Sequence, residues 1–191
     1  MKVLYKQAIS EAELITGCKE GVSKYQELLY KSYVSSLFPI CLRYASNYHE
    51  AEDVLQESFM RIFRAIKSFR GDGSFEGWMK RIVVNTSIEW YKKNWMQHHS
   101  LELAVAEYDN VHDDVWQHIE ARELLSFIQK LAPGYRTIFN LYVIEGYTHK
   151  EIAMLMGISE GTSKSQLARS RVILQRMILQ ANKTRIAAAV L

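Results

Sequence analysis

Thr148-His149-Lys150-Glu151-Ile152-Ala153-Met154-Leu155-Met156-Gly157-Ile158-Ser159 is the stretch that decides the fold, because it predicts the first helix and the turn of a helix-turn-helix. Thr148 and Glu151 have the spacing of a capping box, in which two side chains satisfy backbone donors at a helix start. Ala153 is small enough for two helices to cross closely. Gly157 suits the left-handed position that a three-residue turn requires.

The second helix of this motif is predicted to begin after Ser159, which can cap it, and to carry the side chains that face DNA. In such motifs the first turns of the second helix enter the major groove, where Lys, Gln and Arg can read purine edges. A helical hairpin with a solvated basic face is the alternative. The predicted reading residues are Thr162, Lys164, Ser165, Gln166 and Arg169, with Arg171 and Arg176 available to phosphates.

The rest of the chain also has the apolar periodicity of helices. Of 191 residues, 48% are hydrophobic, and only nine glycines and two prolines interrupt the three- and four-residue spacing. We therefore expect an all-α protein with two small helical domains, a flexible acidic linker and a helix-turn-helix in the C-terminal domain. Predicted helices cover about 10–19, 25–44 with a kink or break at Pro39, 47–67, 74–93, 116–131, 133–145, 148–156 and 159–180. Asn47 and Ser74 are the predicted caps of the helices at 47–67 and 74–93. The inward stripe of the 74–93 helix is predicted to consist of Phe75, Trp78, Met79, Ile82, Val83 and Thr86.

Charge is distributed unevenly along the chain, although its net value is only +3. Residues 101–123 hold seven Asp or Glu against one Arg, whereas residues 133–191 hold eight Lys or Arg against three Glu. Residues 95–117 also lose helical periodicity, so we interpret them as the linker. The two domains are then expected at 1–94 and 118–191.

The outward face of the 47–67 helix is predicted to be polar throughout and to carry a polar strip. Its members recur at three- and four-residue spacing: Asp53, Gln56, Glu57, Arg61 and Arg64. On periodicity alone, a solvated face joined by pairs such as Glu57 with Arg61 is favoured. A surface that docks another helix is the alternative.

A second polar surface is predicted on the 74–93 helix. Arg81, Asn85, Glu89 and Lys92 align on one side, and Trp78, Trp90 and Tyr91 supply aromatic rings. Asparagine offers a donor and an acceptor, arginine neutralises phosphate and rings offer stacking planes, a mixture that suits unstacked bases. Taken alone, the tryptophans are more typical of core anchors than of base platforms.

Sequence signatures of enzymes and metal sites are missing. The glycine-rich stretch 71–77 has neither dinucleotide-binding spacing nor the lysine of a phosphate loop, and no GxSxG or HExxH occurs. The histidines at 98, 99, 112 and 118 could bind a metal, but they lack i,i+4 pairing and companion cysteines. We expect no catalytic residue, no metal and no cofactor.

The cellular compartment is predicted from the cysteines and from the apolar segments of the sequence. Cys18 and Cys41 form no CxxC pair and sit in helical patterns, so we expect small buried hydrophobes in a reducing cytosol. The amino terminus has no basic segment followed by an apolar stretch, and no run of about 18 apolar residues occurs. A cytoplasmic protein without membrane insertion is expected.

Four motifs, taken together and in this order, resemble those of the extracytoplasmic-function (ECF) sigma factors of the sigma-70 family. They are AEDVLQESF at 51–59, FRGDGSFEGW at 69–78, RIVVNT at 81–86, and EIA at 151–153 with GISEGT at 157–162. The resemblance covers about residues 20–180. It implies a non-catalytic subunit that binds core RNA polymerase and directs promoter recognition and transcription initiation, with a region 2 domain at 1–94 and a region 4 domain at 118–191.

The resemblance also implies roles for single residues in the first domain. The polar strip would dock on the clamp helices of the polymerase β′ subunit through Asp53, Gln56, Glu57 and Arg61. The second surface would bind the minus-10 element as single-stranded DNA, with one base extruded into a loop pocket. Its residues would be Arg70, Asp72, Ser74, Arg81, Asn85 and Glu89.

In the second domain, the reading helix would bind the minus-35 element as duplex while the same domain contacts the β flap. The residues implied are Thr162, Lys164, Ser165, Gln166, Arg169 and Arg171. An anti-sigma factor is an expected partner besides promoter DNA and polymerase. A free-standing DNA-binding regulator is the main rival hypothesis, and a helical adaptor without nucleic-acid contact is a third.

The chain departs from the family's pattern at three positions. Ser163 and Gln166 stand where many members carry an apolar and a basic residue, so the base preference of the reading helix is open. Ala132 stands before Pro133 where Leu is usual, which implies a smaller anchor for packing between the domains.

Overall fold

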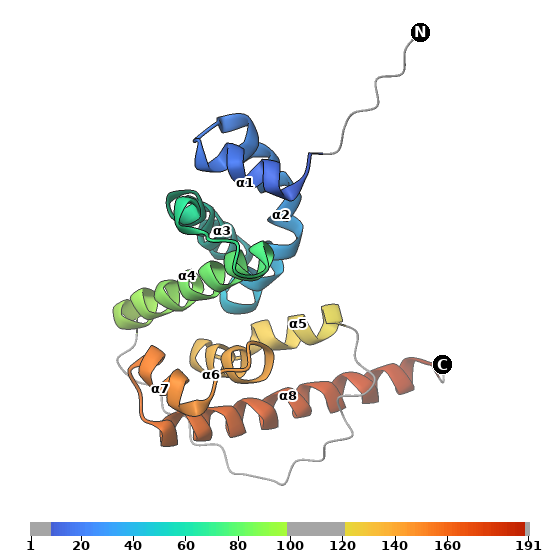
Figure 1. The fold of residues 1–191 in the computed structure, drawn as a ribbon. Helices are drawn as coiled ribbons and strands as arrows, with labels where there is room; N and C mark the ends of the chain where they lie inside the picture. The colour runs from blue at the N-terminus through green and yellow to red at the C-terminus, as the bar shows by residue number, and fades with distance from the viewer. Residues whose placement is uncertain (1–8, 99–120, 190–191) are drawn as a thin grey trace.

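Residues 9–98 and 121–189 are described in the computed structural model, and every regular element within these two ranges is helical. Figure 1 shows two helical units, one above the other. The predicted all-α class and the division into two helical domains are confirmed. Most of the predicted linker, at 99–117, lies outside the described residues.

The N-terminal unit consists of α1 (Glu11–Lys19), α2 (Ser23–Tyr44), α3 (Tyr48–Ala65), the 3-10 turn η1 (Ile66–Ser68) and α4 (Phe75–His98). The predicted segment around Pro39 is one continuous helix, α2. The end of α4 at His98 is later than the predicted 93.

Local capping explains where these helices begin, as the sequence predicts. The Glu50 amide donates to the Asn47 side chain at 2.8 Å at the start of α3. The Gly77 amide donates to the Ser74 hydroxyl at 3.2 Å at the start of α4. Such bonds satisfy amides that have no intrahelical acceptor.

The C-terminal unit consists of α5 (Ala121–Lys130), α6 (Pro133–Phe139), the π-helical segment η3 (Asn140–Ile144), α7 (His149–Met156) and α8 (Glu160–Ala189). The predicted 133–145 helix is thus an α-helix that continues as one π turn. The predicted end of α8 at 180 is too early. Ile178 is buried, Ala181 packs against the core, and Arg185 bonds Glu123 of α5 at 2.9 Å, so the helix has tertiary partners beyond that point.

The hydrophobic core runs through both units. Both cysteines are free and buried, as predicted, and burial raises the pKa of the Cys41 thiol to about 12. Within the described ranges, no helix has the length and apolar character needed to cross a membrane. The largest fully buried apolar side chains include Leu29, Leu37, Ile62, Phe75 and Met79 in the first unit and Ile138, Leu141, Ile152 and Leu174 in the second.

α4 is buried on two sides, because the C-terminal unit packs against the side that the first unit leaves open. Met79 and Val83 belong to the predicted inward stripe of this helix and are buried. Val84 is also buried and lines a cavity shared with Glu145 and Tyr147 of the C-terminal unit. Two turns further on, the Tyr91 hydroxyl reaches Gly134 of α6.

A polar clasp of five residues, Arg43, Ser46, Arg136, Asn140 and Glu145, joins the two units. Arg43 pairs with Glu145 at 2.6 Å. The Arg136 guanidinium donates to the Ser46 hydroxyl at 3.0 Å, and the Asn140 amide donates to the Arg43 carbonyl at 2.6 Å. The two domains therefore lie directly against each other, whereas the sequence predicted mainly a tether between them.

The helix-turn-helix has the predicted local structure. Thr148 and Glu151 form a complete capping box, and hydrogen bonds from Thr148 lower the pKa of the Glu151 carboxyl. Gly157 ends α7 in the left-handed region with φ of 67°. Ser159 caps the second helix by accepting from the Thr162 amide at 3.0 Å.

We predict that Gly157→Ala lowers the free energy of unfolding by about 1 kcal/mol, because a residue with a Cβ is strained at this positive φ. Urea unfolding followed by circular dichroism measures the change. Gly161→Ala is the matched control, since a Cβ there meets only the Ser159 side chain at 3.6 Å. Equal losses for the two variants would show that the turn does not need its glycine.

Candidate nucleic-acid and polymerase interfaces

The loop before α4 and the first turns of that helix enclose a pocket of about 500 Å³. Phe69, Phe75 and Trp78 pack together beside it, with Trp78 stacked on Phe75 at 5.6 Å between ring centroids. The Lys19 ammonium fixes the loop by donating to the Phe69 carbonyl at 2.8 Å. The lining includes four of the predicted minus-10 residues, namely Arg70, Asp72, Ser74 and Arg81.

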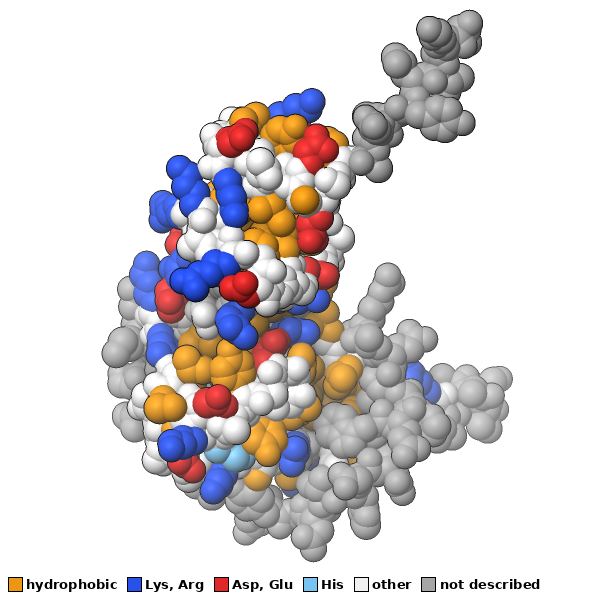
Figure 2. Space-filling model, viewed as in Figure 1, with side chains coloured by type: hydrophobic (Ala, Val, Ile, Leu, Met, Phe, Trp, Pro, Cys, Tyr) orange, Lys and Arg blue, Asp and Glu red, His pale blue; other side chains and the backbone are white. Residues whose placement is uncertain are grey.

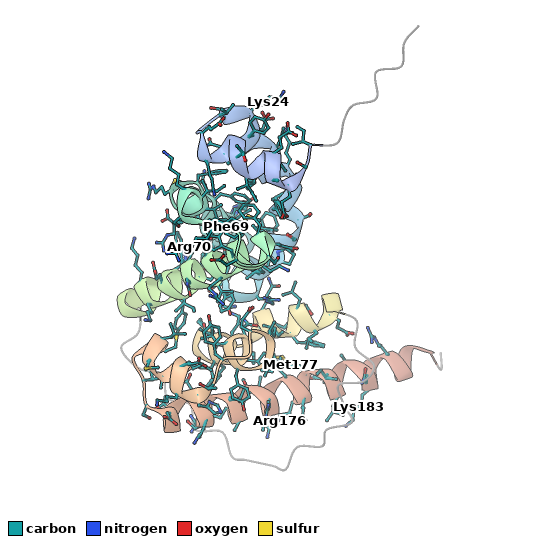
Figure 3. The ribbon with its side chains drawn as sticks, in the orientation of Figure 1. Lys24, Phe69, Arg70, Arg176, Met177 and Lys183 are labelled. Atoms are coloured by element: carbon teal, nitrogen blue, oxygen red, sulfur yellow. The ribbon has the colours of Figure 1, made fainter. Side chains whose placement is uncertain are left out.

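The pocket opens onto an exposed polar face of α4. Arg81, Asn85 and Glu89 are all exposed and follow one another at four-residue spacing, so the structure places them in one row that leads away from the pocket. On the side viewed in Figure 2, Lys and Arg side chains gather over α3 and α4. Figure 3 labels Phe69 and Arg70 at the pocket end of this row.

Arg81 also lines a second cavity, of about 560 Å³, between α4 and the C-terminal unit. Across this cavity lie Glu145 and Glu151, and Lys80 lies beside Arg81 on its own helix. The proposed DNA-binding face of α4 therefore borders directly on the C-terminal unit.

The polar strip of α3 is joined to the α4 row by one arginine. The Arg61 guanidinium donates to Glu57 at 2.8 Å and to Glu89 at 2.6 Å. These two hydrogen bonds raise the pKa of Arg61. The predicted pair of Glu57 with Arg61 is confirmed. Because all three side chains are partly exposed, solvent limits the contribution of these pairs to stability.

A groove of about 520 Å³ between α2 and α3 lies beside the strip and includes Asp53 and Gln56. Its other walls are mostly apolar, with side chains such as Tyr30, Phe38 and Phe59. The prediction of a wholly polar outer face on α3 is wrong at Met60, which is 43% exposed and lines this groove. An exposed apolar side chain within a polar strip is the sequence signal that could have identified the groove.

The structure divides the six predicted minus-35 residues of α8 among three sides of the helix. Thr162, Ser165 and Arg169, all half-buried, share the side opposite the buried stripe of Leu167 and Leu174, and Arg176 on that side is exposed (Figure 3). Lys164 and Arg171 are exposed at the edge next to α7. Gln166 lies toward α6, where its amide oxygen is 3.4 Å from the place of a Cβ on Gly134.

His149 and Tyr142 lie at this end of the domain, and neither was predicted as a site residue from the sequence. His149, at the start of α7, stacks on Tyr142 at 4.4 Å between ring centroids, and its Nδ1 lies 2.9 Å from the Ser163 hydroxyl. The Arg171 guanidinium lies 6.0 Å from the centre of the Tyr142 ring. These contacts join residues of different helices, so sequence spacing alone could not predict them.

In the part of the chain that the structure describes, no group of three or more His, Cys, Asp or Glu side chains is placed to hold a metal ion. The predicted histidine candidates at 99, 112 and 118 lie outside the described residues.

Comparison with known proteins agrees with the division into two helical units. The sequence model described as Sigma-70 region 2 matches residues 29–96, and the one described as Sigma-70, region 4 matches residues 121–174. Together they cover well over half of the chain, and each falls on one of the two helical units.

Relatives of known function are similar over most of the chain. The ECF RNA polymerase sigma-E factor of Haemophilus influenzae is 27% identical over 90% of this chain and 97% of its own length. The ECF RNA polymerase sigma factor SigE of Mycolicibacterium smegmatis is 29% identical over 82% of this chain, but the match spans only 62% of that protein.

Solved structures similar to this chain include the sigma factor RpoE in complex with the anti-sigma factor NepR from Bartonella quintana, with a TM-score of 0.47 and 19% identity over 81% of this chain and 96% of that one. From the two region matches and the similarity to named ECF sigma factors, we conclude that the chain belongs to the sigma-70 family, as a sigma factor of the ECF group.

Proposed function

We propose that this sigma factor recruits core RNA polymerase through α3 and reads its promoter with two separate surfaces. Asp53, Gln56, Glu57 and Arg61 would contact the β′ clamp helices, with the apolar groove beside them receiving part of the partner. On the second unit, Val143, Ile144 and Met154 are exposed apolar side chains that would offer the β flap a contact.

The minus-10 element would be bound as single-stranded DNA by Arg70, Asp72, Ser74, Arg81, Asn85 and Glu89. The observation that carries this proposal is the continuity of the loop pocket with the exposed row on α4. The pocket has aromatic side chains against which an extruded base can stack, and the row continues in the direction that a single strand would follow.

The minus-35 element would be bound as duplex by α8. Thr162, Ser165 and Arg169 would face base edges, while Lys164, Arg171 and Arg176 would contact phosphates at the edges of the groove. Gln166 would contribute only if its side chain turned away from α6, which belongs to the same unit.

The remaining proposals follow from family membership and the sequence. The minus-10 domain would span 1–94 and the minus-35 domain 118–191, with 95–117 as the linker. The protein would act in the cytoplasm without catalytic activity of its own, and an anti-sigma factor would compete for its polymerase-binding surfaces.

Run-off transcription with purified core polymerase and a genomic library tests the proposed function. A sigma factor should give specific transcripts only when both core and this protein are present. A free-standing regulator, the rival, should instead retard its DNA site without polymerase. An adaptor without nucleic-acid contact should show no salt-sensitive DNA binding at all.

Arg169→Ala should reduce discrimination between the preferred minus-35 element and a mismatched one by about 1 to 3 kcal/mol, if its guanidinium reads a base edge. Binding of the holoenzyme to duplexes that differ at single minus-35 positions measures this. The same variant should bind duplexes that already carry the mismatch almost as tightly as the wild type does. A uniform loss over all sequences would assign Arg169 to phosphate instead.

A further inference from the structure

Ser163 is a polar residue on a buried stripe of α8 that holds mostly apolar side chains. It is fully buried in the first turns of α8, on the same stripe as Leu167 and Leu174. Its neighbours in the chain, Thr162 and Lys164, belong to the proposed minus-35 surface. A buried hydroxyl is costly unless it has a hydrogen-bond partner, so the partner of Ser163 influences how these turns are held.

That partner comes from a different helix. His149 of α7 has its Nδ1 atom 2.9 Å from the Ser163 hydroxyl. The imidazole is held from its other side by Tyr142 of η3, whose ring is nearly parallel to it at an interplanar angle of 23°. The contacts thus run from η3 through α7 to the first turns of α8.

We propose that His149 is a positioning residue for minus-35 recognition. Its neutral ring accepts a hydrogen bond from the Ser163 hydroxyl at Nδ1 and thereby fixes the rotation of the first turns of α8, which carry Thr162, Lys164 and Ser165. This inference rests on the proposed function and extends it, because it names a residue that sets the reading geometry without touching DNA.

The surroundings of His149 favour the neutral ring that this role needs. Burial lowers the pKa of His149, and the positive charges of Lys164 and Arg171 lower it further, while Glu160 opposes them. Tyr142 contributes an aromatic face on the remaining side. A neutral imidazole protonated at Nε2 has its free lone pair on Nδ1, which matches the position of the hydroxyl.

Two substitutions separate the hydrogen bond from the stacking. His149→Asn places a polar side-chain atom near the position of Nδ1 but removes the ring. His149→Phe keeps a ring against Tyr142 but removes the acceptor. A third variant, His149→Phe with Ser163→Val, replaces the polar pair by an apolar one and leaves no buried hydroxyl without a partner.

The measurement uses holoenzyme assembled from core polymerase and the full chain, on a promoter selected from randomised duplexes by that holoenzyme. The readout is the ratio of run-off transcript from the selected promoter to that from a copy with a scrambled minus-35 element. We expect His149→Phe to lower this ratio about fivefold to tenfold, the effect of leaving one buried hydroxyl unsatisfied. His149→Asn and the double variant should stay within about twofold of the wild type.

Controls make the outcomes separable. His49→Phe changes an exposed histidine on α3 and should leave the minus-35 ratio unchanged. In the free chain, ¹⁵N NMR should show His149 protonated at Nε2, with Nδ1 as an acceptor. The inference is overturned if His149→Phe keeps the wild-type ratio, if His149→Asn loses as much as His149→Phe, or if Nδ1 carries the proton. A wild-type protein that directs no transcription overturns the proposed function as well.

Discussion

Arg136→Ala should lower the free energy of unfolding by about 3 kcal/mol, which is a large effect for a single polar side chain. Arg136 is only 2% exposed, and its guanidinium donates to the Gln129 carbonyl at 2.9 Å and to the Ser46 hydroxyl at 3.0 Å. Alanine would leave the part-buried Gln129 carbonyl without this donor and would open a cavity, and the two costs add. Urea unfolding followed by circular dichroism measures the loss.

Ser46→Ala is the control that isolates the contact between the two units. Ser46 is exposed, so its loss removes one hydrogen bond of the clasp and opens no cavity, and we expect at most about 1 kcal/mol. If Arg136→Ala cost no more than Ser46→Ala, the buried guanidinium would be important only for the contact between the units and not for the C-terminal unit itself.

The features predictable from the sequence are those set by residues close together along the chain. The capping box of Thr148 with Glu151, the caps at Asn47 and Ser74 and the left-handed turn at Gly157 were all predicted correctly. Each depends on a side chain and a backbone group within about one helical turn, so spacing alone identifies it.

The features that could not be predicted depend on residues far apart in the sequence. The clasp joins Arg43 to Glu145 and Asn140, and no local spacing relates these positions. The contact of His149 with Ser163 likewise depends on how α7 and α8 pack against each other, which local spacing does not determine. The burial of α4 on both sides was not predicted, because the predicted stripe covers only one side of the helix. Val84 and Ile88 are the apolar residues of the second buried side.

The placement of the candidate site residues was predicted correctly where periodicity alone fixes a helix face. Arg81, Asn85 and Glu89 lie in one exposed row, as their spacing requires. Gln166 is the counterexample, since it follows the reading residues in sequence but lies toward α6. Its orientation depends on the position of α6, which the periodicity of α8 does not determine.

Asn85→Ala should impair promoter opening about tenfold or more and leave assembly with core polymerase intact. Asn85 is exposed in the middle of the α4 row, between Arg81 and Glu89, and its amide can donate and accept at one base edge. Losing such a paired contact costs about 1 to 3 kcal/mol, and each 1.4 kcal/mol is a factor of ten. Permanganate reactivity of unpaired thymines measures opening, and a pull-down with core polymerase measures assembly.

Asn182→Ala provides the matched control for this prediction, because it makes the same chemical change on α8, beyond the residues matched by the region 4 model. It should leave both opening and assembly unchanged. If Asn85→Ala weakened core binding as much as it weakened opening, Asn85 would belong to the polymerase interface. If opening were unaffected, the row on α4 would not be the path of the minus-10 strand, since its central residue would have no role there.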